Sequence, residues 1–420
     1  MPEIKRFRGL KNTESEERLR AGDLSEATNV DLTNSGKLMS RKGYEQVNAT
    51  AVHSLYSNHL LAVVGAGSTL SRVNPDGTLT ALASLGSSNP VSYETVGDTI
   101  YYANGAVVGS VVGATARSWG VAPPAGQPAA QAQSTGVLTP GTYQYAMTYV
   151  CSDGHESGTG VAGQVTLTAQ GGIQFSGMVD STNPRVNGKM LYLSGPDGEV
   201  LYRVATVPSG ISTFYVGVAL GTVPLTTQFA GPPPAGGIVR YFAGRMWVVV
   251  GEVAYFSDPY DLELFRIGTN YLRAPAALSL FEPIGDGIFA ATQDGASGDD
   301  SEAAGTTWYW AGTNPMQMKS VHVFDHGAVP GTSVLTNAGF LQQAGADAEG
   351  ISPRLAVVWV SRFGICVGFE GGAAENLTEG RYSFPVAQRG AGMVRQDRGY
   401  ISYVATLQGV SAANNEYNRG

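Results

Sequence analysis

Apolar and polar residues alternate over short segments through most of the 420-residue chain, and Gly, Asn, Asp or Pro separates one segment from the next. Strict alternation is the pattern of a strand with one buried face. In the segment TYQYAMTYV it places Tyr143, Tyr145, Met147 and Tyr149 on one face. We therefore predict short β-strands joined by tight turns along almost the whole chain.

Turn residues divide these strands into repeating units. Asn104-Gly105 is a strong hairpin signal, because both residues tolerate the positive φ of a type I′ turn. Further turns are predicted at 33–36, 74–77, 195–198, 243–244 and 285–287. Units of turn, apolar strand, turn and strand recur irregularly every 30 to 55 residues or so, as in the blades of a β-propeller. We predict an irregular propeller of five or six blades, with several separate sandwiches as the alternative.

Two proline-rich segments interrupt this rhythm, at 120–134 and 230–237, and their composition is that of linkers. About 95 residues of strand and turn lie between them, which is enough for a small immunoglobulin-like β-sandwich. The predicted fold class is thus all-β, with a sandwich inserted into a propeller. The predicted parts are an N-terminal arm with a first strand (1–45), a first propeller part (46–120), the sandwich (121–236) and a second propeller part (237–420).

The one good helix signal lies in residues 12–27. Thr13 and Glu16 have the spacing of a capping box, and Gly22 is a suitable terminator. A helix of about two turns is too short to be stable alone in water. We therefore expect this short N-terminal helix to dock on the rest of the protein or on a neighbour.

Composition and charge narrow the class of protein. Glycine numbers 56 and only 14% of residues are charged, which excludes a helical bundle or coiled coil. Residues 1–44 carry 9 basic and 7 acidic groups, and the other 376 carry 17 basic and 27 acidic groups. Binding to nucleic acid through its phosphates needs clustered positive charge, so the acidic balance of residues 45–420 argues against such binding. The same balance suits a surface along which DNA passes without being bound.

Signals for metals, disulfides and targeting are weak. Cys151 and Cys366 lie 215 residues apart and make neither a disulfide framework nor a zinc site by themselves. His322 and His326 flank Asp325, but ligands four residues apart converge on a helix, and this segment has the pattern of a strand. We expect no cofactor, no secretory signal, no membrane segment and synthesis in the cytosol.

Other clusters have a structural and a functional interpretation. Trp308-Tyr309-Trp310 has the alternation of a core strand, with a sugar-stacking platform as the alternative. A cluster of acidic residues is expected to lie in a solvated loop rather than to bind calcium. A cluster of arginines is compatible with a propeller glycosidase, which is an alternative to a non-enzymatic protein. The acidic cluster comprises Asp294, Asp299, Asp300 and Glu302, and the arginines are Arg240, Arg245, Arg266 and Arg273. No nucleophile elbow, phosphate-binding loop or zinc-protease motif occurs, so we expect no enzyme.

The N-terminal segment 7–44 resembles the opening of tail and head-to-tail proteins of tailed bacteriophages. The segment 253–315 is similar to the propeller of the same proteins, and TYQYAMTYVCSDGHESG resembles their fibronectin type III-like modules. The residues that carry the N-terminal resemblance are Phe7, Gly9, Glu17, Arg18, Leu24, Glu26, Ala27, Asn29, Val30, Asp31, Gly36, Leu38, Arg41, Gly43 and Tyr44.

The resemblance implies a structural virion protein of the tail nozzle or tail tube. Such a protein forms a homo-oligomeric ring of six subunits near the portal vertex, contacts the adaptor and other tail proteins, and retains and conducts genomic DNA. The basic N-terminus would suit docking on such neighbours. The alternative is a solvated charged face with a first strand that closes the propeller. The candidate docking residues are Lys5, Arg6, Arg8, Lys11, Arg18, Arg20, Arg41 and Lys42. A carbohydrate-binding propeller or adhesin at the host surface is the alternative.

Overall fold

The computed structural model describes residues 6–33, 35–41, 43, 45–294, 305–342, 355–384, 387–397 and 400–408. The chain divides into two compact units. The first unit comprises Met1–Thr50, Gly251–Val253 and Arg273–Gly420, and the second comprises Ala51–Val250 and Ala254–Leu272. The division runs through the segment 237–420 that the sequence suggests as one propeller part.

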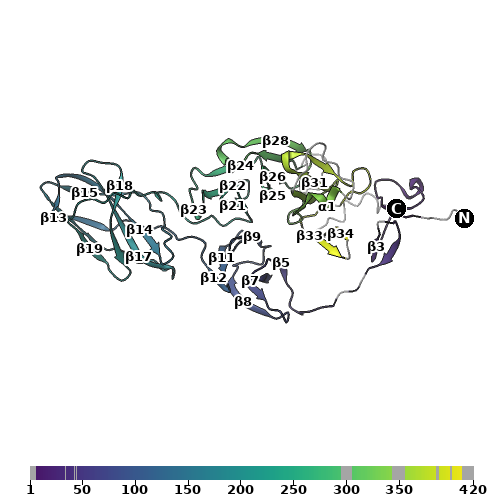
Figure 1. Cartoon of the computed structure of the whole chain (residues 1–420), viewed down its shortest axis with the longest axis horizontal. Coiled ribbons are helices and arrows are strands. Elements are labelled where there is room, and N and C mark those ends of the chain that lie inside the picture. Colours follow the sequence, from purple (N-terminus) through teal and green to yellow (C-terminus); the bar gives the residue numbers. More distant parts are fainter. Residues whose placement is uncertain are drawn as a thin grey trace. The chain divides into compact units, whose positions relative to one another are not determined.

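Outside residues 129–216, the second unit contains three antiparallel sheets whose strands follow one another along the chain (Figure 1). In the third sheet an additional strand, β24, pairs with β22. The strands of the three sheets are β5 (His53–Ser57), β6 (Ala62–Ala66), β7 (Thr69–Val73) and β8 (Leu79–Ser84); β9 (Ser92–Val96), β10 (Thr99–Ala103), β11 (Val108–Val112) and β12 (Thr115–Arg117); and β20 (Ile238–Phe242), β21 (Arg245–Val250), β22 (Val253–Asp258), β23 (Asp261–Phe265) and β24 (Tyr271–Arg273).

Successive sheets of this unit pack through apolar faces. One cluster joins the first two sheets through side chains such as Leu70 and Ile100, and another joins the second and third through Tyr101 and Val248. Face-to-face packing of consecutive four-stranded meanders is the arrangement of propeller blades.

The first unit contains two more four-stranded sheets, which share a core that includes Phe289 and Trp359. A long hairpin and short helical segments complete it. The strands are β25 (Leu278–Ile284), β26 (Gly287–Thr292), β27 (Thr307–Ala311) and β28 (Lys319–Phe324); β29 (Val334–Asn337), β30 (Leu355–Ser361), β31 (Gly364–Phe369) and β32 (Ala374–Asn376); and the hairpin β33 (Arg389–Asp397) and β34 (Tyr400–Gln408). The helical segments here are α1 (Ala338–Gln342), η2 (Pro315–Gln317) and η3 (Glu370–Gly372).

The prediction of an all-β fold of propeller type is confirmed, with five blade-like sheets among the described residues. Turns form at 74–77, 195–198 and 243–244, with positive φ at Gly77, Asp197, Ala243 and Gly244. At Asn104-Gly105 only Gly105 has positive φ, so the turn is not of type I′. Ala243 and Gly244 both have positive φ, 51° and 77°, between β20 and β21. Asn104 caps its own turn, since its side-chain oxygen accepts from the amides of Ala106 and Val107.

Residues 129–216 form two facing sheets within the second unit. One sheet has the order β13-β16-β19 and the other β15-β14-β17-β18. The strands are β13 (Ala129–Leu138), β14 (Gly141–Cys151), β15 (Gly163–Leu167), β16 (Gly171–Ser176), β17 (Val186–Ser194), β18 (Leu201–Pro208) and β19 (Thr213–Val216).

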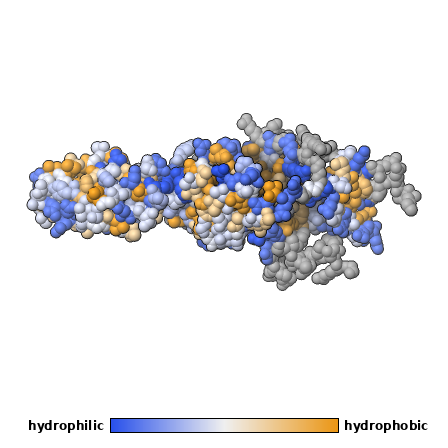
Figure 2. Space-filling view, turned by 90° about the horizontal axis from the view of Figure 1, so that it is seen from below, coloured by the Kyte–Doolittle hydropathy of each residue, from blue (hydrophilic) through white to orange (hydrophobic). Residues whose placement is uncertain are grey.

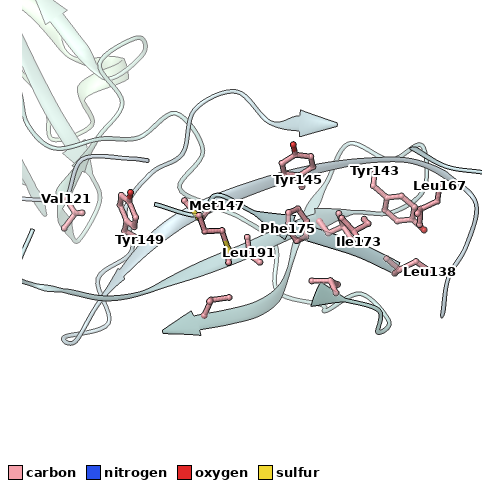
Figure 3. Close-up of a cluster of buried hydrophobic side chains, with 14 of the residues drawn as sticks. Val121, Leu138, Tyr143, Tyr145, Met147, Tyr149, Leu167, Ile173, Phe175 and Leu191 are labelled. Carbon is pink, nitrogen blue, oxygen red and sulfur yellow. The ribbon is translucent and has the colours of Figure 1, made fainter. Parts of the chain in front are cut away.

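One apolar core fills the space between these two sheets. Tyr143, Tyr145, Met147 and Tyr149 are all buried in it, as their alternation predicts. Figure 3 shows the labelled side chains as a continuous row that ends near Leu138. Tyr143 also donates a hydrogen bond to the carbonyl of Thr139 four residues earlier, at 2.7 Å, the type of contact made in a tyrosine corner. The sandwich architecture is present, and its assignment to the fibronectin type III-like modules stays a prediction.

The N-terminal arm, residues 6–50, differs from the prediction in one element. It contains a parallel pair, a hairpin and a single 3₁₀ turn, but no α-helix among its described residues. These elements are β1 (Gly9–Leu10), β2 (Asp23–Leu24), β3 (Val30–Leu32), β4 (Leu38–Ser40) and η1 (Glu16–Arg18). The predicted capping box does not form, because the Thr13 hydroxyl donates to the carbonyl of Gly380, at 2.7 Å. Tertiary hydrogen bonds outweigh a helix signal of only two turns.

Candidate interaction sites

The N-terminal arm has almost no interior of its own. Of its described residues only Gly22 and Gly36 are buried, while Leu32 and Met39 of the β3–β4 hairpin are 41% and 56% exposed. A two-stranded hairpin without an apolar face packed on something is marginally stable in water. The arm therefore presents both backbone and side chains that are available to a neighbour.

A loop at 378–383 holds the arm within the first unit. Asn12 and Ser383 form a reciprocal pair: the Asn12 amide donates to the Ser383 carbonyl, and the Ser383 N–H donates to the Asn12 carbonyl oxygen, both at 2.9 Å. Arg381 donates to the carbonyl of Arg8 and lies 3.5 Å from Asp23. Polar contacts, rather than buried apolar area, fix this attachment.

Most candidate docking residues are on the surface of the arm. Arg6, Arg8, Arg18, Arg20 and Arg41 are exposed. The exception is Lys11, which is half-buried and pairs with Glu14 at 2.7 Å. Lys5 and Lys42 lie outside the described residues. The five arginines come from different turns and strands of the arm.

A charged cluster that sequence reasoning missed lies where the sandwich meets the blade sheets of the second unit. Arg185 lies just before β17, and both of its terminal nitrogens donate hydrogen bonds to the carboxylate of Glu263 in β23, at 2.8 and 3.1 Å. One of these nitrogens also donates to Asp153 at 2.9 Å, and the other to the carbonyl of Ser118 at 3.1 Å. A bidentate arginine–carboxylate pair is among the stronger polar contacts in proteins.

Three more charged or titratable side chains complete this junction cluster. Arg117 of β12 lies 3.6 Å from Asp153 and 3.9 Å from Glu263. His155 places Nε2 3.5 Å from Glu263 and Nδ1 3.9 Å from Asp261. The side chains of Arg185, Glu263 and His155 are only about one-tenth exposed. The junction cluster is thus Arg117, Asp153, His155, Arg185, Asp261 and Glu263.

The electrostatics of the cluster follow from burial and pairing. Burial alone lowers the pKa of Arg185, but its hydrogen bonds to Glu263 and Asp153 outweigh burial and raise that pKa above its usual value. For Asp153, burial alone would raise the pKa, but the hydrogen bond and charge of Arg185 have the larger effect. The pKa of Asp153 is therefore below its usual value. The pKa of Asp261 is raised by burial. Arg185 therefore stays charged, and burial makes Asp261 easier to protonate than a solvent-exposed aspartate.

The start of the first proline-rich segment is packed, in contrast to its linker-like composition. Trp119 is 2% exposed, contacts the rings of Tyr101 and Phe265, and donates its indole N–H to the carbonyl of Leu262 at 2.8 Å. Gly120 has φ +80°, and a Cβ there would meet the carbonyl of Glu263 at 2.9 Å. The first segment is therefore part of a fixed junction between sandwich and blades.

The candidate metal and sugar sites take on structural roles. His322 pairs with Asp325 at the surface, whereas His326 stacks on Phe324 and burial lowers its pKa. Among the described residues no group of His, Cys, Asp and Glu has the arrangement of a metal site. Asp294 is buried and accepts hydrogen bonds from the amides of Gly305 and Gly327, and the other three acidic residues of its cluster lie outside the described residues.

Aromatic residues 308–310 belong to β27, where Tyr309 and Trp310 are buried and Trp308 is half-buried. Each of the four arginines has its own hydrogen-bond partner: Arg240 binds Ser92, Arg245 the carbonyl of Ser257, Arg266 Asp258 and Arg273 Glu252. Exposed hydrophobic residues are dispersed among hydrophilic ones on the face drawn in Figure 2. No helix in the described part of the chain is long and apolar enough to span a membrane.

Comparisons with known proteins add little beyond the fold. No protein-family model and no curated protein matches the sequence. Among solved structures, the chain is similar to the Pan2 WD40 domain of Neurospora crassa, at 10% identity and a TM-score of 0.32, over 86% of this chain and 92% of that one. It is also similar to streptogramin B lyase, at 8% identity and a TM-score of 0.32, over 86% and 94% of the two chains. Similarity this low carries no functional argument, and the strand order given above is what defines an all-β, propeller-type fold.

Proposed function

We propose that this chain is a structural, non-enzymatic virion protein of a tailed bacteriophage. In this proposal it assembles with itself into a ring, of six copies by the resemblance of its N-terminal segment, at the portal-proximal end of the tail. The ring would contact the adaptor and other tail proteins and would retain and conduct genomic DNA.

The observation that carries the proposal is the state of the N-terminal arm. The residues that resemble the openings of phage tail proteins belong to a segment that buries only two glycines in its own chain. A segment with exposed apolar residues and five exposed arginines has surface to bury against a neighbour. The acidic balance of residues 45–420 further supports passage of DNA without fixed phosphate contacts.

Deletion of residues 1–44 tests the proposal. The full chain should form rings visible by negative-stain electron microscopy, and the truncated chain should remain a folded monomer by analytical ultracentrifugation and circular dichroism. A full chain that stays monomeric at high concentration would contradict the proposal. A truncated chain that still forms rings would contradict the role of the arm.

A carbohydrate-binding role is the second candidate, and one observation favours it. Tyr260 is 86% exposed at a φ of 59°, in the turn between β22 and β23. Exposed aromatic rings offer an apolar face and a polar edge, as sugar-stacking residues do. Glycan-array binding that Tyr260→Ala abolishes would support this role, and an array without signal would dismiss it.

A further inference from the structure

The three-stranded sheet of the sandwich, β13-β16-β19, has no charged residue in any of its strands. The facing sheet carries Lys189 in β17 and Arg203 in β18. Charged residues are depleted at the centre of binding surfaces, because taking a charge out of water is costly. The outer face of the three-stranded sheet is therefore suited to contact with an uncharged molecule.

The strand register shows which side chains stand on this outer face. Ile173 and Phe175 of β16 belong to the core between the two sheets (Figure 3). Gln174 lies between them in sequence and therefore points outward, opposite Gln131 of β13 and Tyr215 of β19. Residues opposite each other on one face of antiparallel strands have Cβ atoms about 4.5 to 5.5 Å apart. These three side chains thus form one outward row across the sheet.

Tyr215 lies along the sheet surface instead of projecting from it. A Cβ at Gly172 would meet the Tyr215 hydroxyl at 2.3 Å, and a Cβ at Gly217 would meet the Cε1 atom of its ring at 2.6 Å. The hydroxyl donates a hydrogen bond to the carbonyl of Thr135 in β13, so the side chain reaches across β16 from one edge strand to the other. One face of the ring rests on backbone, and the residue is still 39% exposed. A ring fixed in this way loses little freedom when a ligand binds to its other face.

Polar, uncharged groups surround this ring. Gln131 is exposed, and the amide nitrogen of Gln174 donates to the carbonyl of Phe175 at 3.0 Å, which orients that side chain. Ser176 and Thr213, which lie opposite each other two residues further along β16 and β19, add two hydroxyls to the same face. An amide both donates and accepts hydrogen bonds, as a hydroxyl does. The face thus combines one flat aromatic ring with groups that complement hydroxyls.

We propose that Tyr215 is the stacking platform of a binding site for a neutral oligosaccharide. One sugar ring places its C–H groups on the exposed face of Tyr215, and its hydroxyls bond to the amides of Gln131 and Gln174. An acidic sugar is disfavoured, because the sheet has no cation to pair with a carboxylate or sulfate. A protein partner is expected to bury several large apolar anchors, and this row of three has only one aromatic residue.

The site deepens the carbohydrate-binding candidate and rests on it, and it is independent of the ring assignment. The full chain would be applied to an array that carries neutral hexose and N-acetylhexosamine oligosaccharides beside sialylated and sulfated ones. We expect signals on neutral glycans that stay the same between about 50 and 500 mM salt, because no ion pair contributes. Titration calorimetry with the neutral glycan of strongest signal then gives the affinity of each variant.

Two substitutions on the face and two elsewhere test the assignment. Tyr215→Ala should weaken binding at least about tenfold, and Tyr215→Phe, which keeps the ring, by no more than about threefold. Gln131→Ala should weaken it about threefold or more through loss of a hydrogen bond. The matched controls are Tyr260→Ala, at another exposed tyrosine, and Gln164→Ala, at an exposed glutamine of β15 in the facing sheet. Neither control should change the affinity.

Each contrary outcome has its own meaning. Wild-type affinity in Tyr215→Ala, or a preference for acidic glycans that fades with salt, would overturn the proposal. A signal that Tyr260→Ala removes and Tyr215→Ala keeps would also overturn it, while carbohydrate binding itself would stand. An array without signal would overturn both, and dissociation of copies of the full chain by Tyr215→Ala would then make the face a protein contact. If circular dichroism shows that Tyr215→Ala unfolds the sandwich, Gln131→Ala decides, because its exposed side chain lies outside the core.

Discussion

At the scale of single residues, Phe175 shows how closely the sandwich core is packed. Its ring is fully buried and meets Tyr145 edge-on with centroids 5.2 Å apart. We expect Phe175→Ala to lower the free energy of unfolding by about 3 to 5 kcal/mol in a denaturant titration, because it leaves a cavity. The exposed Phe229 is the control, and Phe229→Ala should change it by no more than about 0.5 kcal/mol. Equal effects would contradict the assigned core.

Gly36 has a different role, in the turn between β3 and β4. It has φ +75°, and a Cβ would lie 2.1 Å from the Arg6 side chain and 2.9 Å from the carbonyl of Phe7. Gly36→Ala should therefore cost about 1 to 3 kcal/mol locally and speed hydrogen exchange at the amide of Phe7. Gly43→Ala, which meets no atom within 4 Å and has no positive φ, should leave that exchange rate unchanged. If both variants exchange alike, the turn is not constrained.

Sequence reasoning succeeds where the determining chemistry is local. The turn at Asn104-Gly105 forms because the Asn104 side chain accepts two amide hydrogen bonds and Gly105 adopts a φ of 83°. The junction cluster was missed because Arg185 and Glu263 are 78 residues apart, and each lies in an ordinary polar segment. Only the fold brings such residues together, and no spacing rule in the sequence signals it.

At the scale of elements, the N-terminal helix shows where local reasoning fails. The capping-box spacing of Thr13 and Glu16 is real, but Thr13 finds its hydrogen-bond partner 367 residues away. The proline-rich segment 120–134 is a similar case, since its composition is that of a linker and Trp119 beside it is buried. The blade patterns were predictable because each blade sheet is formed by strands that are consecutive in the chain.

Attachment of the arm gives the element-scale prediction. Asn12→Ala removes both side-chain hydrogen bonds to Ser383 and should loosen the arm on the loop at 378–383, while the contacts of Thr13 and Arg381 remain. Limited proteolysis within residues 6–41 should become several-fold faster, while the blade sheets stay resistant. Thr28→Ala, which loses only a local bond to Glu26, is the matched control. Unchanged cleavage in Asn12→Ala would mean that other contacts hold the arm.

At the scale of the whole molecule, charge is divided unevenly along the chain, and this division has a measurable consequence. Residues 1–44 carry a balance of +2, from 9 basic and 7 acidic groups, and the rest carry −10, from 17 basic and 27 acidic groups. Affinity for DNA that rests on phosphate contacts falls steeply with salt and requires clustered cations. Any weak retention of DNA should therefore depend on the arm.

Fluorescence anisotropy with a labelled duplex can measure this dependence. At about 50 mM salt the full chain should show weak binding, which disappears at about 150 mM salt. A chain without residues 1–44 should show none at either concentration, because its remaining surface repels the phosphates. Binding that survives the deletion would reveal a basic surface on the sheets, and a body of that kind would hold DNA rather than let it pass.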